Sequence, residues 1–181
     1  MSKDQFMNPD YKPDKNTKQE IEKLHNNGIS LVGVYLTYAQ MKNANLVNVD
    51  MSGADLSRSD FSGASMYGAN LEGANLFKAN FEGANLKSAN LCKCDLLGAD
   101  FSNTKLNNVE WGKDYKVINE QMAEAALAEG DPEKAREKYK EAEDIYRSLK
   151  ISLKMQTLGD NVGKFFEREM IARRKQMPRF S

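Results

Sequence analysis

The chain has 181 residues, of which 40% are hydrophobic and 29% are charged, a composition typical of an ordinary folded protein with one or two domains. Its 26 Lys and Arg residues balance 26 Asp and Glu residues, which excludes a strong overall field that would attract nucleic acid or an acidic substrate. No apolar run approaches the roughly 20 residues that cross a bilayer, and the first residues lack the apolar core of a signal peptide, so we expect a cytoplasmic protein.

Residues 1–28 are predicted to form a polar tail followed by a short helix. Asn16 or Thr17 can cap this helix, and Gly28 can end it. Ile21 and Leu24 give it a small apolar face. We expect the helix to cover the open end of the structure that follows, because an uncovered end exposes core residues and unpaired backbone groups.

From residue 29 to residue 113, a small or apolar residue and then a large apolar residue recur every five residues. The large positions are Leu31, Leu36, Met41, Leu46, Met51, Leu56, Phe61, Met66, Leu71, Leu76, Phe81, Leu86, Leu91, Leu96, Phe101, Leu106 and Trp111. The small position lies two residues before each of them, from Ile29 to Val109. A period of five fits neither a helix nor a strand, so we expect each unit to be one straight side followed by a corner.

A second period of twenty residues indicates how these units stack. The columns of identical residues are Phe61, Phe81 and Phe101 and, on the preceding side, Leu36, Leu56, Leu76 and Leu96. Four units of five residues should therefore close one turn of a four-sided solenoid. Backbone groups of successive turns would pair at roughly 4.8 Å per layer.

The units Ala-Asn-Leu-Glu-Gly, Ala-Asn-Leu-Phe-Lys and Ala-Asn-Phe-Glu-Gly, which follow one another from residue 69 to residue 83, resemble those of the pentapeptide-repeat proteins. The resemblance implies a right-handed quadrilateral β-helix of about four coils. We therefore expect a mainly β fold with a short N-terminal capping helix and about three C-terminal helices. The expected domains are residues 1–28, 29–113 and 114–181.

Around Tyr115 the five-residue period gives way to a helical one. A first helix, near residues 116–129, would place Ile118, Met122 and Ala125 on its inner face. A second helix should begin at Asp131 as the cap with Pro132 in its first turn, and should end at residue 159. Its predicted inner face is Ala135, Tyr139, Ala142, Tyr146, Leu149 and Leu153.

A third helix is predicted to begin at Asp160. The residues expected on its inner face are Val162, Phe165, Phe166 and Met170.

The junction Gly130-Asp131, with Ala135, Tyr139 and Ala142 at their offsets, resembles a tetratricopeptide repeat. Residues 159 and 160 repeat the junction after 29 residues, whereas that family repeats after about 34. We favour a helical module that caps the solenoid and docks onto other proteins. A peptide-binding groove is the alternative.

We predict no catalytic, cofactor-binding or metal-binding residues and no enzymatic activity. The aspartates of the repeats all occupy the slot before the large residue, where local hydrogen bonds to the turns explain them, although a catalytic pair is the alternative. These aspartates are Asp50, Asp55, Asp60, Asp95 and Asp100. The sequence Cys92-Lys93-Cys94 is a weak metal signal, and we interpret Cys94 as an inward replacement for alanine.

A candidate interaction surface lies on one wall of the predicted solenoid. Phe77 and Leu97 are one coil apart in an outward slot, and Tyr35 and Tyr38 lie on the same side. Adjacent apolar side chains on a polar wall should be covered, so we expect the helices to fold back here or two chains to meet here. Ordinary surface exposure is the alternative.

A second candidate contact is the basic end of the chain. Its residues are Arg168, Arg173, Arg174 and Lys175. Positive side chains late in a helix complement the helix dipole, which explains them without a partner. The alternative is contact with an acidic partner, an anionic lipid or a membrane segment.

The leading functional hypothesis is a protein-interaction scaffold whose protein partner is unidentified and which could form a homodimer or a higher homo-oligomer. The resemblance also implies an alternative, a DNA mimic that binds a type II topoisomerase such as gyrase. However, residues 29–113 carry eight acidic and seven basic residues, so they present no acidic stripe. A further alternative is the soluble part of a larger or membrane-associated assembly.

Direct nucleic-acid binding is not expected, because the sequence has no basic stripe. Membrane contact would involve only the basic C-terminal tail.

Overall fold

The computed structural model describes residues 2–156 and 159–177, with the side chains of residues 159 and 160 excluded. The chain divides into two compact units, Met1–Glu110 and Trp111–Ser181, which we call the repeat unit and the helical unit. None of the described helices is long and apolar enough to span a membrane.

The N-terminal segment covers the first coil of the repeat unit. It contains a 3₁₀ helix, η1 (Asp4–Met7), and the helix α1 (Thr17–Asn26). The backbone N–H of Tyr35 donates to the carbonyl of Phe6 at 2.7 Å, and the N–H of Asn45 donates to the Glu22 carboxylate at 2.8 Å. The backbone N–H groups of the first coil have no preceding coil to bond with. The N-terminal segment supplies hydrogen-bond acceptors for two of them.

The cap of α1 differs from the prediction. The Asn16 side chain makes no capping hydrogen bond. Instead, Oδ1 of Asp14 accepts hydrogen bonds from the backbone N–H groups of Asn16 at 2.8 Å and Thr17 at 3.1 Å. As predicted, Ile21 and Leu24 form the buried face of the helix.

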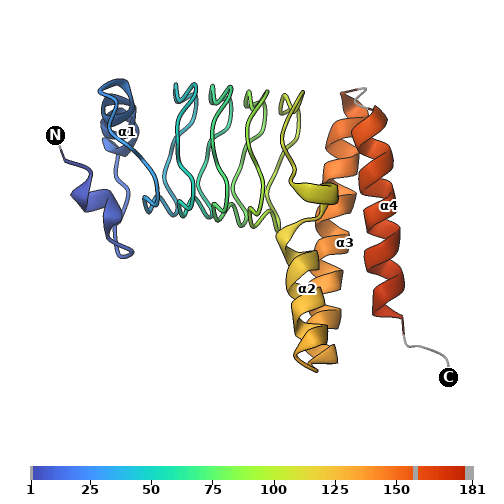
Figure 1. The fold of residues 1–181 in the computed structure, drawn as a ribbon. Helices are drawn as coiled ribbons and strands as arrows, with labels where there is room; N and C mark the ends of the chain where they lie inside the picture. Colours follow the sequence, from blue (N-terminus) through green and yellow to red (C-terminus); the bar gives the residue numbers. More distant parts are fainter. Residues whose placement is uncertain (1, 157–158, 178–181) are drawn as a thin grey trace. The chain divides into compact units, whose positions relative to one another are not determined.

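Successive coils of the repeat unit lie side by side along the region that runs from cyan to yellow-green in Figure 1. Every large position from Leu31 to Leu106 is buried, as is every small position from Val34 to Val109. The predicted inward register is therefore confirmed, with one exception. Ile29, the first small position, is 38% exposed.

The predicted mainly β fold, a right-handed quadrilateral β-helix, is wrong for this chain. The described residues form no continuous strand and no sheet, and only 9% of the residues are bridged. Each bridge is isolated and joins single residues twenty positions apart, from Tyr35 with Asp55 to Asn90 with Glu110. A corner every five residues turns the chain before consecutive residues can extend a ladder, so the four α-helices hold most of the regular structure of the described residues.

The corners explain why Gly and Asn recur in the sequence. The residue two positions after each large residue from Leu31 to Leu106 has a positive φ, as at Gly73 (70°) and Asn48 (57°). Glycine adopts this left-handed region without steric cost, and asparagine tolerates it better than most residues. Five residues with other side chains occupy the same position, namely Tyr38, Arg58, Lys78, Ser88 and Lys93.

Ser88→Gly is expected to raise the free energy of unfolding by about 0.5 kcal/mol. Ser88 is exposed with φ of 59°, so glycine would relieve left-handed strain, while the greater freedom of glycine in the unfolded chain offsets part of the gain. Gly73→Ala is the matched control, because no atom beyond the neighbouring residues lies within 4 Å of the added Cβ and only the positive φ opposes alanine. This substitution should lower the free energy of unfolding by about 1 kcal/mol. Urea unfolding that ranked the two variants in the opposite order would contradict this account of the corners.

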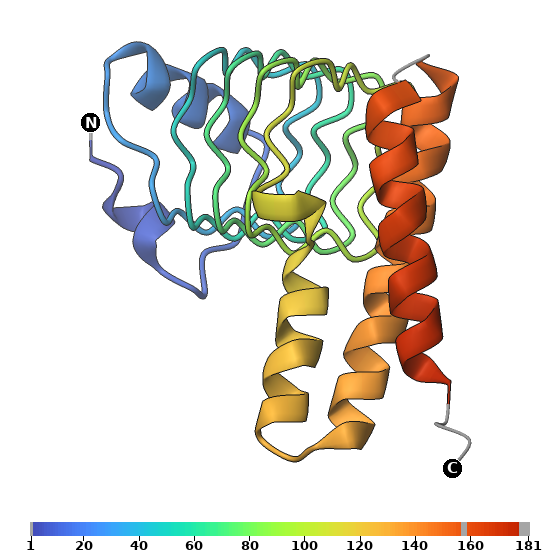
Figure 2. The ribbon, with the colours of Figure 1, turned by 45° about the vertical axis from the view of Figure 1, so that its right-hand side comes forward.

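The helical unit consists of a 3₁₀ helix, η2 (Lys113–Tyr115), and three α-helices. These are α2 (Ile118–Ala128), α3 (Pro132–Met155) and α4 (Gly159–Gln176). The long helix α3 packs against both α2 and α4 (Figure 2). It begins as predicted, because Oδ1 of Asp131 accepts a hydrogen bond from the N–H of Lys134 at 3.0 Å. Its predicted inner face from Ala135 to Leu153 is also buried, together with Ile145.

The predicted inner face of α2 is wrong in part, because only Ile118 of its three residues is partly buried. Met122 is 47% exposed and Ala125 is exposed. The residues buried instead are Asn119, Glu120, Ala123 and Ala126.

The predicted inner face of α4 is wrong in part. Phe165 is buried and Val162 is partly buried, but Phe166 is 52% exposed and Met170 is 44% exposed. Glu169 is buried instead, because Lys150 and Arg147 of α3 pair with its carboxylate. A glutamate that finds cations on the neighbouring helix can thus occupy a position that the apolar pattern assigned to methionine.

Candidate functional site

One corner column of the repeat unit departs from the usual small residues. Tyr38, Arg58 and Lys78 occupy equivalent corners of three successive coils, with φ of 64°, 58° and 54°. We use the term corner patch for these three residues together with Phe77 and Leu97.

Cationic and aromatic groups alternate along the corner patch. Cζ of Arg58 lies 5.5 Å from the ring centroids of both Tyr38 and Phe77. Nη1 of Arg58 donates to the hydroxyl of Tyr38 at 2.6 Å. Nζ of Lys78 lies 5.2 Å from the ring centroid of Phe77. Cation–π contacts of this kind are worth about 0.5–1 kcal/mol each at exposed sites.

The left-handed backbone conformation of Tyr38, Arg58 and Lys78 lowers the stability of the fold, and glycine at these positions would avoid this strain. A bulky residue in the left-handed region costs roughly 1–2 kcal/mol relative to glycine. The next corner in the same column is Gly98, so the coil can be built there without a large side chain. The strain at Tyr38, Arg58 and Lys78 is therefore not imposed by the fold.

The structure brings together some of the predicted surface residues and separates others. Tyr38, which is 56% exposed, and Phe77, which is half-buried, meet through Arg58. Leu97 is half-buried, and its carbonyl accepts a hydrogen bond from the N–H of Lys78 at 2.9 Å. Tyr35 is half-buried and its backbone is bonded to the N-terminal segment.

Sequence reasoning missed Arg58 and Lys78 as members of this surface. The available signal was a run of three large residues, twenty positions apart, in a corner slot that carries Gly or Asn in most other units.

The four predicted basic contact residues do not form one group. Arg173, Arg174 and Lys175 are exposed on α4. Arg168 faces the other helices, where its Nε donates to the carbonyl of Asp114 at 2.8 Å and its Nη1 lies 3.4 Å from Oε1 of Glu120.

Glu120 is the centre of a buried polar network that joins α2, α3 and α4. Its carboxylate accepts a hydrogen bond from the hydroxyl of Tyr146 at 2.5 Å and pairs with Arg168. The hydroxyl of Tyr146 in turn accepts from the N–H of Val117 at 3.0 Å. Burial, followed by the hydrogen bond to Glu120, raises the pKa of Tyr146 well above its ordinary value. The network therefore ties α2, α3 and α4 together through buried hydrogen bonds and one ion pair.

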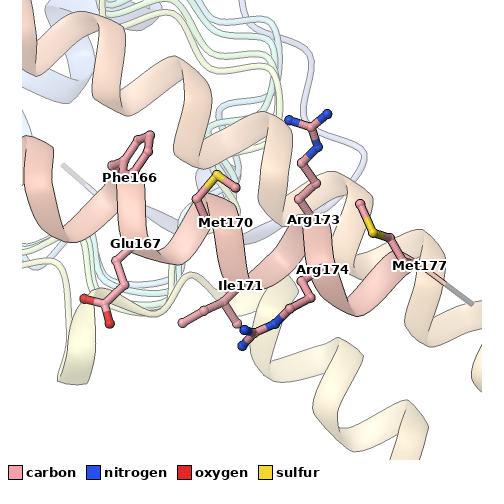
Figure 3. A pocket seen from close by; sticks show the side chains of 7 residues that line it. All are labelled: Phe166, Glu167, Met170, Ile171, Arg173, Arg174 and Met177. Atoms are coloured by element: carbon pink, nitrogen blue, oxygen red, sulfur yellow. The ribbon is translucent and has the colours of Figure 1, made fainter. Parts of the chain in front are cut away.

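A shallow groove runs along α4 between two rows of its side chains (Figure 3). One row consists of Phe166, Met170, Arg173 and Met177, and the other of Glu167, Ile171 and Arg174.

The aspartates of the repeats accept hydrogen bonds from the backbone of the turns, as predicted from the sequence. Asp50, Asp55, Asp60, Asp95 and Asp100 each accept a hydrogen bond from the N–H two residues later, at 2.8–3.1 Å. Within the described part of the chain, no three His, Cys, Asp or Glu side chains are grouped to hold a metal ion. Cys94 points inward as predicted, and burial raises the pKa of its thiol to about 12.

The repeats match a known family model. The model for pentapeptide repeats matches in eight copies, over residues 27–53, 39–77, 54–91 and 69–108. Residues 27–108 of the chain therefore consist of pentapeptide repeats. The resemblance of the helical unit to a tetratricopeptide repeat is not confirmed. None of the curated proteins matches the chain.

Several solved structures of pentapeptide repeat proteins are similar to parts of the chain. Rfr23 from the cyanobacterium Cyanothece 51142 is 40% identical over 42% of this chain and 59% of its own, with a TM-score of 0.31. A protein from the Arabidopsis thaliana thylakoid lumen is 28% identical over 41% of this chain and 48% of its own, with a TM-score of 0.31. The protein alr5209 from Nostoc is 29% identical over 55% of this chain and 88% of its own, with a TM-score of 0.27. The chain thus spans about half of the first two structures.

Proposed function

We propose that this pentapeptide-repeat protein is a non-enzymatic interaction scaffold and that the corner patch is its binding surface for another protein. The observation that carries the proposal is the column of bulky cationic and aromatic residues in strained corners. The buried columns beneath this patch hold its backbone rigid, so binding would cost little ordering of the scaffold.

The chemistry of the corner patch favours an acidic segment of the partner. Arg58 and Lys78 are exposed and offer charged donors, and Tyr38 offers an exposed ring. Arginine and tyrosine are also the residue types that contribute most to protein interfaces. A cationic patch is the opposite of the acidic surface that a DNA mimic needs, so we do not extend the topoisomerase hypothesis to this surface.

The test is the double substitution Arg58→Asn with Lys78→Asn, which installs the residue that other corners carry. The variant should be about as stable as the parent, because the relief of strain offsets the lost cation–π contacts, yet it should lose the partner captured by cross-linking from an extract of the source cell. Lys87→Asn is the matched control, since Lys87 is an exposed lysine outside the corner patch. Retention of the same partner by the double variant would refute the proposal, as would equal loss in the control.

A further inference from the structure

The exposed face of α4 has the pattern of a helix that packs against another helix. Phe166, Met170 and Met177 are 52%, 44% and 59% exposed. Together with Arg173 they are spaced by four, three and four residues, which is the seam spacing of a coiled coil. Phe165 and Ala172 already occupy the side of α4 that is buried within the helical unit. The seam is therefore a second packing face.

The charges beside this seam complement a reversed copy of themselves. Glu167 and Arg174 lie in the same row, one on each side of Ile171 (Figure 3). No ion pair found among the described residues includes either of them. If two such helices run antiparallel about a two-fold axis near Ile171, Glu167 of each helix faces Arg174 of the other.

We propose that α4 pairs antiparallel with α4 of a second copy of this chain to form a homodimer. A two-fold interface requires a self-complementary patch, and the reversed order of Glu167 and Arg174 supplies it. Phe166 and Met170 would fill the centre of the contact, where apolar anchors contribute most. An anionic lipid surface fits less well, because Glu167 places an exposed carboxylate beside the apolar seam.

The first test is the mass of the full chain in solution by sedimentation equilibrium, from about 1 to 100 μM, a range in which small interfaces associate. The expected mass is twice the chain mass of 20.4 kDa. Met170→Glu should weaken the association at least about tenfold, because it places a charge in the seam. Lys140→Glu, an exposed change on α3, is the matched control and should leave the mass unchanged.

The second test uses charge exchange at the two exposed positions. Glu167→Arg and Arg174→Glu should each weaken self-association, because like charges would then face each other. An equimolar mixture of the two variants should associate again, since every antiparallel contact between them would pair opposite charges. Circular dichroism should show the same helix content in all variants.

Three outcomes would overturn the proposal. They are a single-chain mass for the parent at the highest concentration, a mixture of charge variants that stays monomeric, and a dimer that Met170→Glu leaves intact. Binding of a monomeric parent to phosphatidylserine vesicles would instead identify a lipid surface as the occupant of this face.

Discussion

Phe81→Ala should lower the free energy of unfolding of the repeat unit by about 3–5 kcal/mol, the usual cost of truncating a packed aromatic residue. Phe81 is fully buried. Its ring stacks on Phe61 at 5.4 Å and on Phe101 at 5.6 Å between centroids, with interplanar angles of 9° and 5°. Alanine would therefore leave a cavity with partners lost both above and below it. Urea unfolding followed by circular dichroism measures the change.

Phe81→Leu is the matched control, because leucine fills the same inward position on the neighbouring side of each coil. Phe81→Leu should lower the free energy of unfolding clearly less than Phe81→Ala does. Ala79→Leu tests the companion small position, which is also buried, and should be harmful through overpacking by about 1–3 kcal/mol. Unfolding curves of Phe81→Ala and Ala79→Leu that coincide with that of the parent would show that these positions do not face a packed core.

Glu120→Ala should destabilise the helical unit by about 3 kcal/mol, because removing one member of a buried charge pair leaves the other uncompensated. The side chain of Glu120 is 2% exposed and that of Arg168 is 20% exposed. The substitution also removes the acceptor of the Tyr146 hydroxyl. Thermal unfolding monitored by the helical signal at 222 nm, together with urea titration, would measure the loss.

Glu124→Ala is the matched control on the same helix. Its carboxylate pairs with Lys116 at 2.9 Å, but the Glu124 side chain is 48% exposed. An exposed pair of this kind contributes about 0–1 kcal/mol, so the control should be nearly as stable as the parent. Equal losses for Glu120→Ala and Glu124→Ala would mean that burial of the network does not matter for stability.

The inward columns of the repeat unit were predictable because space inside a narrow coil restricts every fifth position. A coil that turns after five residues accepts one large and one small side chain per side, so Leu, Phe and Ala recur in step. The same pattern could not show that pairing stops at single residues. Pairing stops there because a corner every five residues turns the chain before a ladder can extend, so the expected mainly β fold was wrong.

The inner face of α3 and its start at Asp131 could also be predicted from the sequence. Apolar residues at helical spacing and a capping aspartate act locally, within one or two turns. The corner patch was predicted only in part. Phe77 and Tyr38 were recognised as apolar residues on one wall, whereas Arg58 was found only when the structure placed its guanidinium between their rings.

By itself, the sequence determined the register of the repeats and the face of α3, because both follow from contacts that recur at fixed short spacings. Only the tertiary structure decided which sides of α2 and α4 are buried. Glu120 and Glu169 can leave water because Arg168, Tyr146 and Lys150 reach them from other helices. A one-dimensional pattern assigns such carboxylates to the surface, since nothing in it shows that a distant residue will offset the cost of burying the charge.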